Sequence, residues 1–176
     1  SHAIALFPGG FGTHDEGFEI MTLVQTGKSD PKPIVCLQAP GCDYWDHWNS
    51  FITDQLLKRR LINAEDLALF TIVDNVEDAV TEIRTFYRRY HSLRFVGRQL
   101  AIRLKTPLSA TQVKDVQQQF SDMLTEGTFE QRPSLPEEID EPGLKDLARL
   151  TFSFNRRNAG RLRQLINHLN QLPSTA

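Results

Sequence analysis

Cysteine is scarce in this sequence, and long apolar segments are missing. The 176 residues include two cysteines, Cys36 and Cys42, whose spacing matches no metal-ligand motif, so we expect no bound metal. So few cysteines are typical of a reduced, cytoplasmic protein. No apolar run approaches the roughly 20 residues that cross a bilayer, and no signal peptide is visible. We therefore predict a cytoplasmic protein without a membrane partner.

A dominant charge of one sign is missing as well. The sequence carries 20 basic and 22 acidic residues, for a net charge of −2. This balance gives no reason to expect nucleic acid as a partner. Basic clusters at residues 58–60 and at Arg84, Arg88 and Arg89 are assigned to solvated helix surfaces, since acidic residues lie nearby. Hydrophobic residues make up 40% of the chain, as in ordinary globular proteins of one or two small domains.

An initiator methionine is the third absence. The chain opens on Ser1-His2 and runs at once into an apolar stretch that leads to its most informative motif. We therefore expect a further amino-terminal portion upstream of this sequence.

The first half of the chain alternates between two kinds of apolar pattern. Short apolar runs at residues 4–7, 33–37 and 70–73 predict buried strands. Helical spacing predicts helices over 15–27, where Gly27 ends the helix, over 44–58, and after a cap at Asn75. Strands that alternate with helices favour a parallel sheet. We predict an α/β fold with a partial Rossmann-like parallel sheet and flanking helices, in a nucleotide-binding domain spanning 1–90.

The second half has a different pattern. Leu100, Ile102 and Leu104 alternate with polar or small residues and predict a half-buried strand. Ser109 opens a predicted helix, and a loop rich in proline and acidic residues follows over 126–142. A second alternating run and a last apolar helical pattern complete the chain. Residues 91–176 are thus predicted to form a small α+β region in the order strand, helix, strand, helix.

A glycine-rich turn joins the first predicted strand to the first predicted helix. The turn is Pro8-Gly9-Gly10-Phe11-Gly12-Thr13. Glycines let a backbone approach a ligand closely, and the amides at a helix start attract anions. Gly9, Gly10, Gly12 and Thr13 are therefore candidate phosphate ligands. Without further evidence, a plain strand-to-helix turn explains the glycines equally well.

Acidic residues follow the glycines directly. Asp15, Glu16 and Glu19 fall within the first predicted turns. Compensation of the helix dipole is one explanation, at about 0.3–1 kcal/mol each. However, carboxylates beside a phosphate site repel the ligand unless one of them has a chemical role. A carboxylate near the sugar of a bound nucleotide can stabilise an oxocarbenium-like centre or orient a water molecule.

The pattern from Pro8 to Glu16 resembles the PGGxGTxxE signature of the LOG family, which has also been described as lysine decarboxylase-like. Further segments that resemble the family are residues 22–28, 32–33, 43–45, 61–66 and 76–79. The resemblance covers about residues 1–88. Residues beyond about 90 are similar to an additional carboxy-terminal region of longer bacterial relatives.

The resemblance implies a function and a set of roles. Characterised LOG proteins resemble nucleoside 5′-monophosphate phosphoribohydrolases, which release a free base and ribose 5-phosphate. On this basis the glycines and Thr13 hold phosphate, Glu16 is the catalytic carboxylate and Glu19 is a helper. The family also uses an arginine from an upstream helix. The resemblance further implies a homodimer or higher homo-oligomer, and we expect no cofactor.

Other residues have weaker claims. Tyr44 and Trp45 follow the second strand and are candidate base contacts, whereas Trp48 fits the core at its helical spacing. His14 fits an exposed or interface position better than a general acid. Arginines at residues 156–163 begin the last predicted helix and form a weak candidate anion site.

Two alternatives to a hydrolase remain open. One is a protein that binds a nucleotide or another phosphate-bearing cofactor without hydrolysis. The other is a role for residues 91–176 in oligomerisation or regulation. Lysine decarboxylation by a pyridoxal-phosphate enzyme is disfavoured, because neither Lys28 nor Lys32 has the context of a Schiff-base lysine.

Overall fold

The computed structural model describes residues 1–138 and 140–173. The chain divides into two compact units. The first comprises Ser1–Phe86 with Arg157–Gln164, and the second comprises Tyr87–Arg156 with Leu165–Ala176. No helix in the described part of the chain is long and apolar enough to span a membrane.

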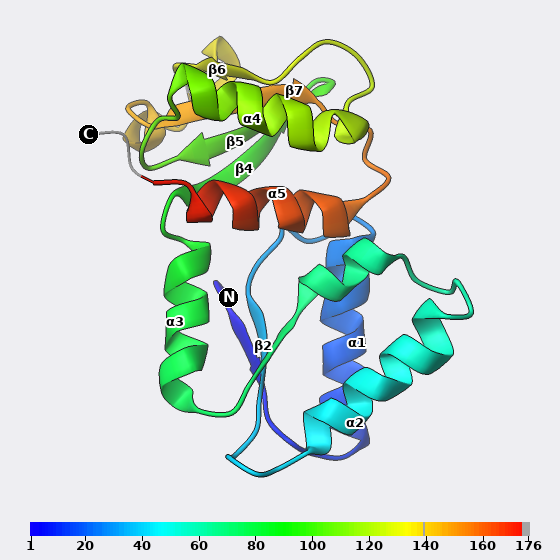
Figure 1. Cartoon of the computed structure of the whole chain (residues 1–176). Coiled ribbons are helices and arrows are strands. Elements are labelled where there is room, and N and C mark those ends of the chain that lie inside the picture. The colour runs from blue at the N-terminus through cyan, green and yellow to red at the C-terminus, as the bar shows by residue number, and fades with distance from the viewer. Residues whose placement is uncertain (139, 174–176) are drawn as a thin grey trace. The chain divides into compact units, whose positions relative to one another are not determined.

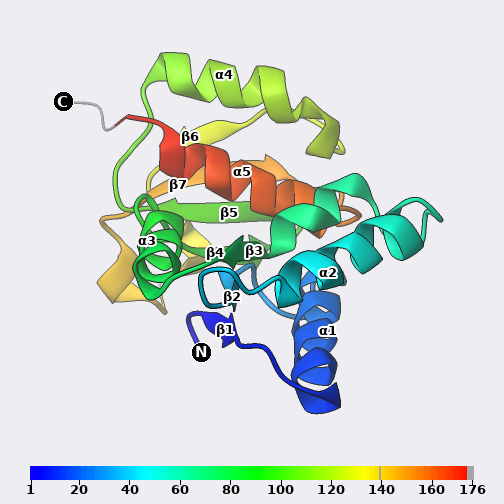
Figure 2. The ribbon, with the colours of Figure 1, turned by 60° about the horizontal axis from the view of Figure 1, so that its bottom comes forward.

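A three-stranded parallel sheet forms the centre of the first unit. Its strands are β1 (Ile4–Leu6), β2 (Ile34–Leu37) and β3 (Thr71–Val73), in the order β1-β2-β3. The helices are α1 (Phe11–Gln25), α2 (Tyr44–Phe51) and α3 (Val76–Phe86). Helices α1 and α2 lie on one side of the sheet and α3 on the other (Figures 1 and 2). The predicted α/β class, with a parallel sheet and flanking helices, is confirmed.

Strand β2 is the centre of this sheet and contributes to both of its faces. Successive side chains of a strand point to opposite faces. Ile34 and Cys36 pack with Trp45 of α2, while Val35 and Leu37 pack with Ala79 of α3. All four β2 residues are buried, as expected for a central strand with helices on both sides. Burial raises the pKa of the Cys36 thiol to about 12, so this cysteine stays protonated in the core.

The helix ends in this unit follow their local sequences. Gly27 has φ of 71° after α1, a conformation that favours glycine. The Asn75 side chain accepts a hydrogen bond of 2.7 Å from the Asp78 amide at the start of α3. Helix α2 continues as a π-helix, η1 (Ile52–Leu57), and a 3₁₀ helix, η2 (Ala64–Leu69), precedes β3. The predicted cap and helix end are therefore confirmed.

An antiparallel sheet forms the centre of the second unit. Its strands are β4 (Tyr90–Val96), β5 (Gln99–Leu104), β6 (Glu130–Arg132) and β7 (Ala148–Ser153), in the order β4-β5-β7-β6. The helices are α4 (Ala110–Phe120), the short 3₁₀ helices η3 (Ser121–Met123), η4 (Pro136–Glu138) and η5 (Pro142–Leu144), and α5 (Ala159–Gln171), which begins in the first unit. Ser109 caps α4 as predicted, accepting from the Gln112 amide at 3.2 Å.

The sequence predicted two strands in this region, and the structure adds β4 and β6. A register shift between Tyr90 and Ser92 interrupts the alternation of β4, so its period of two is hidden. Strand β6 has three exposed residues and carries no apolar signal. Arg89, assigned to a solvated surface, is instead buried, and its guanidinium donates to the Leu169 and Pro173 carbonyls.

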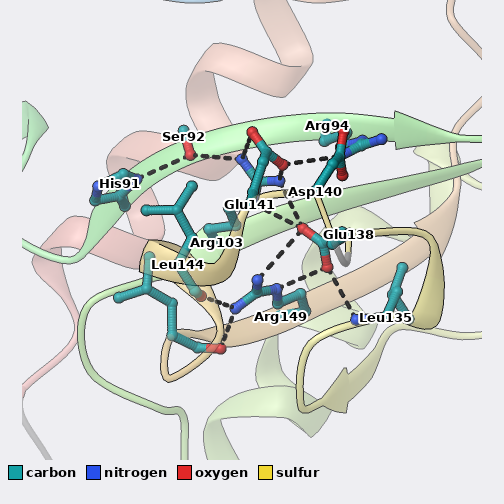
Figure 3. Close-up of polar contacts among 11 residues, drawn as sticks. His91, Ser92, Arg94, Arg103, Leu135, Glu138, Asp140, Glu141, Leu144 and Arg149 are labelled. Carbon is teal, nitrogen blue, oxygen red and sulfur yellow. Dashed lines mark hydrogen bonds and ion pairs between the residues drawn. The ribbon is translucent and has the colours of Figure 1, made fainter.

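A buried ionic cluster links neighbouring strands of the antiparallel sheet to the segment around Glu138 (Figure 3). Arg103 of β5 and Arg149 of β7 are direct cross-strand partners, and like charges in such positions repel. The Glu138 carboxylate lies between them, 2.7 Å from Arg103 Nη2 and 2.9 Å from Arg149 Nε. It also accepts from the Leu135 amide at 3.0 Å. Glu141 contacts Arg103 and Arg94 at the edge of this cluster.

Candidate functional site

The glycine turn follows β1 at the carboxyl edge of the parallel sheet. Helix α1 begins at Phe11, four residues before the predicted start near Asp15. The amides of Thr13 and His14 both approach the Gly10 carbonyl, at 3.1 and 3.4 Å. Gly12 and Thr13 are thus part of the first helical turn rather than of a loop before it. The first amides of a helix lack the partner four residues earlier, so the amides of Phe11 and Gly12 remain available to bind an anion, whereas the Thr13 amide already donates to Gly10.

The three glycines of the turn differ in what requires them. A Cβ on Gly9 would lie 2.2 Å from Thr13 Oγ1, so the close approach of the threonine hydroxyl requires glycine here. A Cβ on Gly10 or Gly12 would meet no atom within 4 Å. Neither residue has a positive φ. Internal packing and backbone conformation therefore do not require glycine at position 10 or 12.

The early start of α1 also changes the meaning of the acidic residues. Asp15 becomes the fifth helical residue, and the first turn contains no acidic residue. Because the dipole acts mainly within the first turn, dipole compensation is a weak explanation for Glu16 and Glu19.

Gly12, Glu16 and Glu19 lie on one face of α1. Residues spaced by four and three positions share a helix face. All three are exposed. Within the described residues, neither carboxylate has a hydrogen-bond or ion-pair partner. The structure thus places two unpaired carboxylates about one and two turns beyond the glycine turn, on the side that carries Gly12.

The two candidate base contacts occupy different environments. Trp45 is 1% exposed, and its Nε1 donates to the Leu37 carbonyl at 3.2 Å. A base cannot stack on a ring that is covered by the core, so Trp45 does not present the surface that this prediction requires. Tyr44 is partly exposed, but its hydroxyl is held at the glycine turn, 2.5 Å from the Gly9 carbonyl. Trp48 is buried, as predicted.

His14 and Gln38 make contacts that the sequence alone does not predict. His14 Nε2 lies 2.7 Å from the Tyr44 hydroxyl, and its ring stacks on the Tyr44 ring. Gln38 is 3% exposed at the end of β2, where its Oε1 accepts from the Trp45 amide at 2.8 Å. Its Nε2 donates to Asp46 and Asp74, at 2.8 and 3.2 Å. A polar residue directly after a buried strand was the available signal for Gln38.

An open hollow lies at the same carboxyl edge of the sheet, where open α/β sheets bind ligands. Its volume is about 540 Å³, and it is lined by residues that include Phe7, Pro8, Gln38, Pro40, Asp74 and Val76. Phe7 is 59% exposed and directly precedes the glycine turn. The hollow therefore adjoins the candidate phosphate site through Pro8.

The lysines of the first unit lie toward the opposite edge of the sheet. Lys32 precedes β2, and Lys28 follows the carboxyl end of α1, about 22 Å along the helix from the glycine turn. Lys58 ends the π-helix that continues α2 and pairs with Asp54 at 2.6 Å. A pyridoxal phosphate held by the glycine turn would find no lysine beside it in this unit. The residues present do not fit that cofactor.

Neither a basic anion site nor a metal site is evident within the described residues. Arg163, one of the arginines of the weak anion site, is 1% exposed and bonded to the Lys32 carbonyl and Glu82, so it serves packing. No group of three or more histidine, cysteine, aspartate or glutamate side chains that could hold a metal ion occurs in the described part of the chain.

The glycine turn, Glu16, Tyr44 and all three parallel strands lie in a segment that matches a known family. Residues 1–83 match the family described as "possible lysine decarboxylase". The match supports the resemblance to the LOG family that the motif indicated, over the first unit. No curated protein matches the chain.

Proposed function

We propose that this protein cleaves the N-glycosidic bond of nucleoside 5′-monophosphates, releasing a free base and ribose 5-phosphate. The observation that carries the proposal is the pair of glycines, Gly10 and Gly12, which neither packing nor backbone conformation requires. A phosphate against their amides accounts for both. The family match over residues 1–83 supports the same class of activity.

The phosphate site is built from Gly9, Gly10, Gly12 and Thr13. Gly9 admits the Thr13 side chain, and the threonine hydroxyl supplies a donor beside the amides of the first turn. The positive end of the α1 dipole adds to the attraction. A phosphomonoester is thereby oriented with its sugar directed along the exposed face of α1.

Glu16 is positioned for the chemistry, with Glu19 as its helper. It stands one turn beyond Gly12 on the same face, so a nucleotide anchored by its phosphate brings its ribose toward this carboxylate. A carboxylate there stabilises positive charge at the anomeric carbon and removes a proton from the attacking water. The carbon–nitrogen bond breaks, the base leaves with the bonding electrons and takes up a proton, and the water oxygen remains on the sugar.

The direct test is hydrolysis by the full-length protein. Incubation with purine and pyrimidine nucleoside 5′-monophosphates is expected to release base and ribose 5-phosphate. Glu16→Gln is expected to lower kcat by about 10²–10⁴, the usual cost of losing one acid–base group. Asp15→Asn, a neighbouring carboxylate off the Gly12 face, is the matched control and is expected to retain activity. Absence of product with wild type, or equal rates for wild type and Glu16→Gln, would contradict the proposal.

A second candidate function uses the same phosphate site without hydrolysis. In that case calorimetry detects binding of nucleoside monophosphates to wild type, and no ribose 5-phosphate accumulates. The unpaired Glu16 and Glu19 argue against this alternative, because two carboxylates with no structural partner weaken anion binding.

A further inference from the structure

The Tyr44 hydroxyl joins two parts of the candidate site that are far apart in the sequence. It lies 2.5 Å from the Gly9 carbonyl and 2.7 Å from His14 Nε2. Two glycines in sequence, Gly9 and Gly10, form the most freely rotating peptide of the turn. The only side chain that contacts this peptide group through a hydrogen bond, among the described residues, is Tyr44.

The contact fixes the direction of an amide. A peptide unit is planar and trans, so the Gly9 carbonyl and the Gly10 N–H point in opposite directions. When Tyr44 holds the carbonyl toward α2, the Gly10 N–H is directed away from α2. A rotated peptide would present the carbonyl oxygen to the phosphate instead and would repel it.

The geometry also determines how His14 takes part. A hydroxyl has one hydrogen, and the short distance to Gly9 requires that hydrogen for the carbonyl. Tyr44 therefore donates to Gly9 and accepts from His14, whose Nε2 carries a proton. The His14 ring is held by Phe18, at a centroid distance of 6.4 Å, and by an edge contact with Trp45 at 6.1 Å. His14 is two positions from Gly12 and does not share its face.

We infer that Tyr44 and His14 are positioning residues for the phosphate site: His14 orients the Tyr44 hydroxyl, and Tyr44 locks the Gly9–Gly10 peptide so that the Gly10 amide is preorganised for the phosphate. This inference rests on the proposed function. Neither side chain contacts the reacting atoms. The aromatic residue after β2 is thus part of phosphate recognition rather than a base contact.

Gln38 supports the same arrangement from the core. The α2 cap residue, Asp43, makes no side-chain capping bond, and the Gln38 Oε1 accepts from the Trp45 amide in the first turn of α2 instead. This fixes the start of α2, where Tyr44 is located. Gln38 thus fixes the position of Tyr44, and Tyr44 in turn fixes the direction of the Gly10 amide.

Tyr44→Phe tests the inference, because it removes the hydroxyl and keeps the ring. The expected result is a KM for nucleoside 5′-monophosphates, and a Kd for ribose 5-phosphate, raised about tenfold, as for one lost hydrogen bond. The kcat is expected to stay within about twofold, since no reacting atom is touched. Tyr87→Phe, which removes a hydroxyl in the second unit, is the matched control and leaves these constants unchanged.

His14 variants provide a rescue experiment. His14→Leu is expected to raise KM as Tyr44→Phe does, whereas His14→Gln keeps an N–H at the same reach and retains wild-type binding. The double variant Tyr44→Phe/His14→Leu is expected to match Tyr44→Phe alone, because both changes break one linked contact. If the double variant lost as much affinity as the two single variants together, Tyr44 and His14 would act independently, and the inference would be overturned.

A measurement on the free protein separates this inference from the proposed function. Relaxation of the Gly10 amide, in protein labelled at glycine nitrogen, is expected to show conformational exchange in Tyr44→Phe and none in wild type. Unchanged Gly10 dynamics would overturn the inference whether or not the protein hydrolyses nucleotides. A Gly10 amide without exchange in wild type, together with binding of ribose 5-phosphate but no hydrolysis, would instead contradict the proposed function alone. A fall in the kcat of Tyr44→Phe at constant KM would give the Tyr44 hydroxyl a role in the chemical step and would also overturn the inference.

Discussion

At the scale of single residues, the glycines of the turn illustrate how one residue type serves different purposes. Gly9 makes room for Thr13 Oγ1, which a Cβ would approach to 2.2 Å. Gly10 and Gly12 have open space around the missing Cβ. Glycine inside a helix costs stability relative to alanine. Gly12 therefore lowers the stability of α1, and no packing contact requires it. Such a cost to stability is typical of functional positions.

Gly12→Ala is expected to separate stability from function. Alanine fits the open space and favours the helix, so the free energy of unfolding should rise by about 0.5–1 kcal/mol in denaturant titrations. The added methyl group would occupy the proposed phosphate position, so the affinity for ribose 5-phosphate should fall at least tenfold in calorimetry. Gly143→Ala, where a Cβ also meets nothing within 4 Å, is the control and should leave this affinity unchanged. Undiminished binding by Gly12→Ala would contradict the assignment of the site.

At the scale of elements, helix starts define the geometry of the first unit. Helix α1 begins at the glycine turn, α2 is fixed by Gln38, and α3 by Asn75. The start of α5 packs differently. Asn158 accepts from the Arg161 amide at 2.8 Å, and Gly160 lies against η2. A Cβ at Gly160 would be 2.3 Å from the Glu65 carbonyl oxygen, which is backbone and cannot rotate away.

Gly160→Ala is expected to destabilise the protein through this contact. Overpacking against backbone costs about 1–3 kcal/mol, and the rigid neighbour places the change near the upper value. The measurement is the midpoint of cooperative unfolding in denaturant, with Gly143→Ala as a glycine-to-alanine control that should shift it little. If Gly160→Ala unfolds at the same denaturant concentration as wild type, α5 and η2 can move apart without loss of stability.

At the scale of the whole molecule, both units bury apolar side chains, and the second also buries a cluster of charged groups. The first packs apolar side chains on both faces of β2. The second packs apolar side chains such as Leu100, Ile102 and Leu150, and it adds buried charge. The side chains of Arg103, Arg149 and Glu138 are 4%, 0% and 0% exposed. Despite the desolvation that opposes it, hydrogen bonds from Arg149, Leu135 and Arg103 lower the pKa of Glu138 to about 2. The buried carboxylate therefore stays ionised and neutralises the paired arginines.

Glu138→Gln is expected to lower the free energy of unfolding by about 3–5 kcal/mol, because it leaves the buried Arg149 without a carboxylate partner and Arg103 with Glu141 alone. Glu137→Gln, at the exposed neighbouring position, is the control and should change it by less than about 0.5 kcal/mol. Equal stability of the two variants in denaturant unfolding would mean that water or another carboxylate replaces Glu138.

The same cluster predicts a dependence of stability on pH. The pKa of Glu138 is lowered from 4.5 to about 2, so the unfolded state binds more protons between these values. Its contribution is complete above about pH 4.5 and is lost as the pH falls toward 2. Asp140 and Glu141, whose pKa values are lowered first by hydrogen bonds from Arg94, act in the same direction. The difference in stability between wild type and Glu138→Gln should therefore shrink over this range and stay constant from pH 5 to 8.

The sequence by itself determined the elements whose signals are local. Apolar runs located β1, β2 and β3, caps at Ser109 and Asn75 located helix starts, and the nine-residue motif located the glycine turn. These features depend on residues that are neighbours along the chain, so their physics can be evaluated without tertiary contacts. The sequence did not predict β4, because a register shift hides its alternation, or β6, because its three polar residues carry no apolar pattern.

Only the tertiary structure decided what the long-range contacts do. The contact from Tyr44 to Gly9 spans 35 positions, and that from Arg103 to Glu138 spans 35 as well. Burial of Trp45 and the open space at Gly10 and Gly12 likewise depend on which segments meet. A sequence specifies which residues are able to bind phosphate or pair charges. Which of them do so depends on the distances that folding sets, because hydrogen bonds and ion pairs act over a few ångströms.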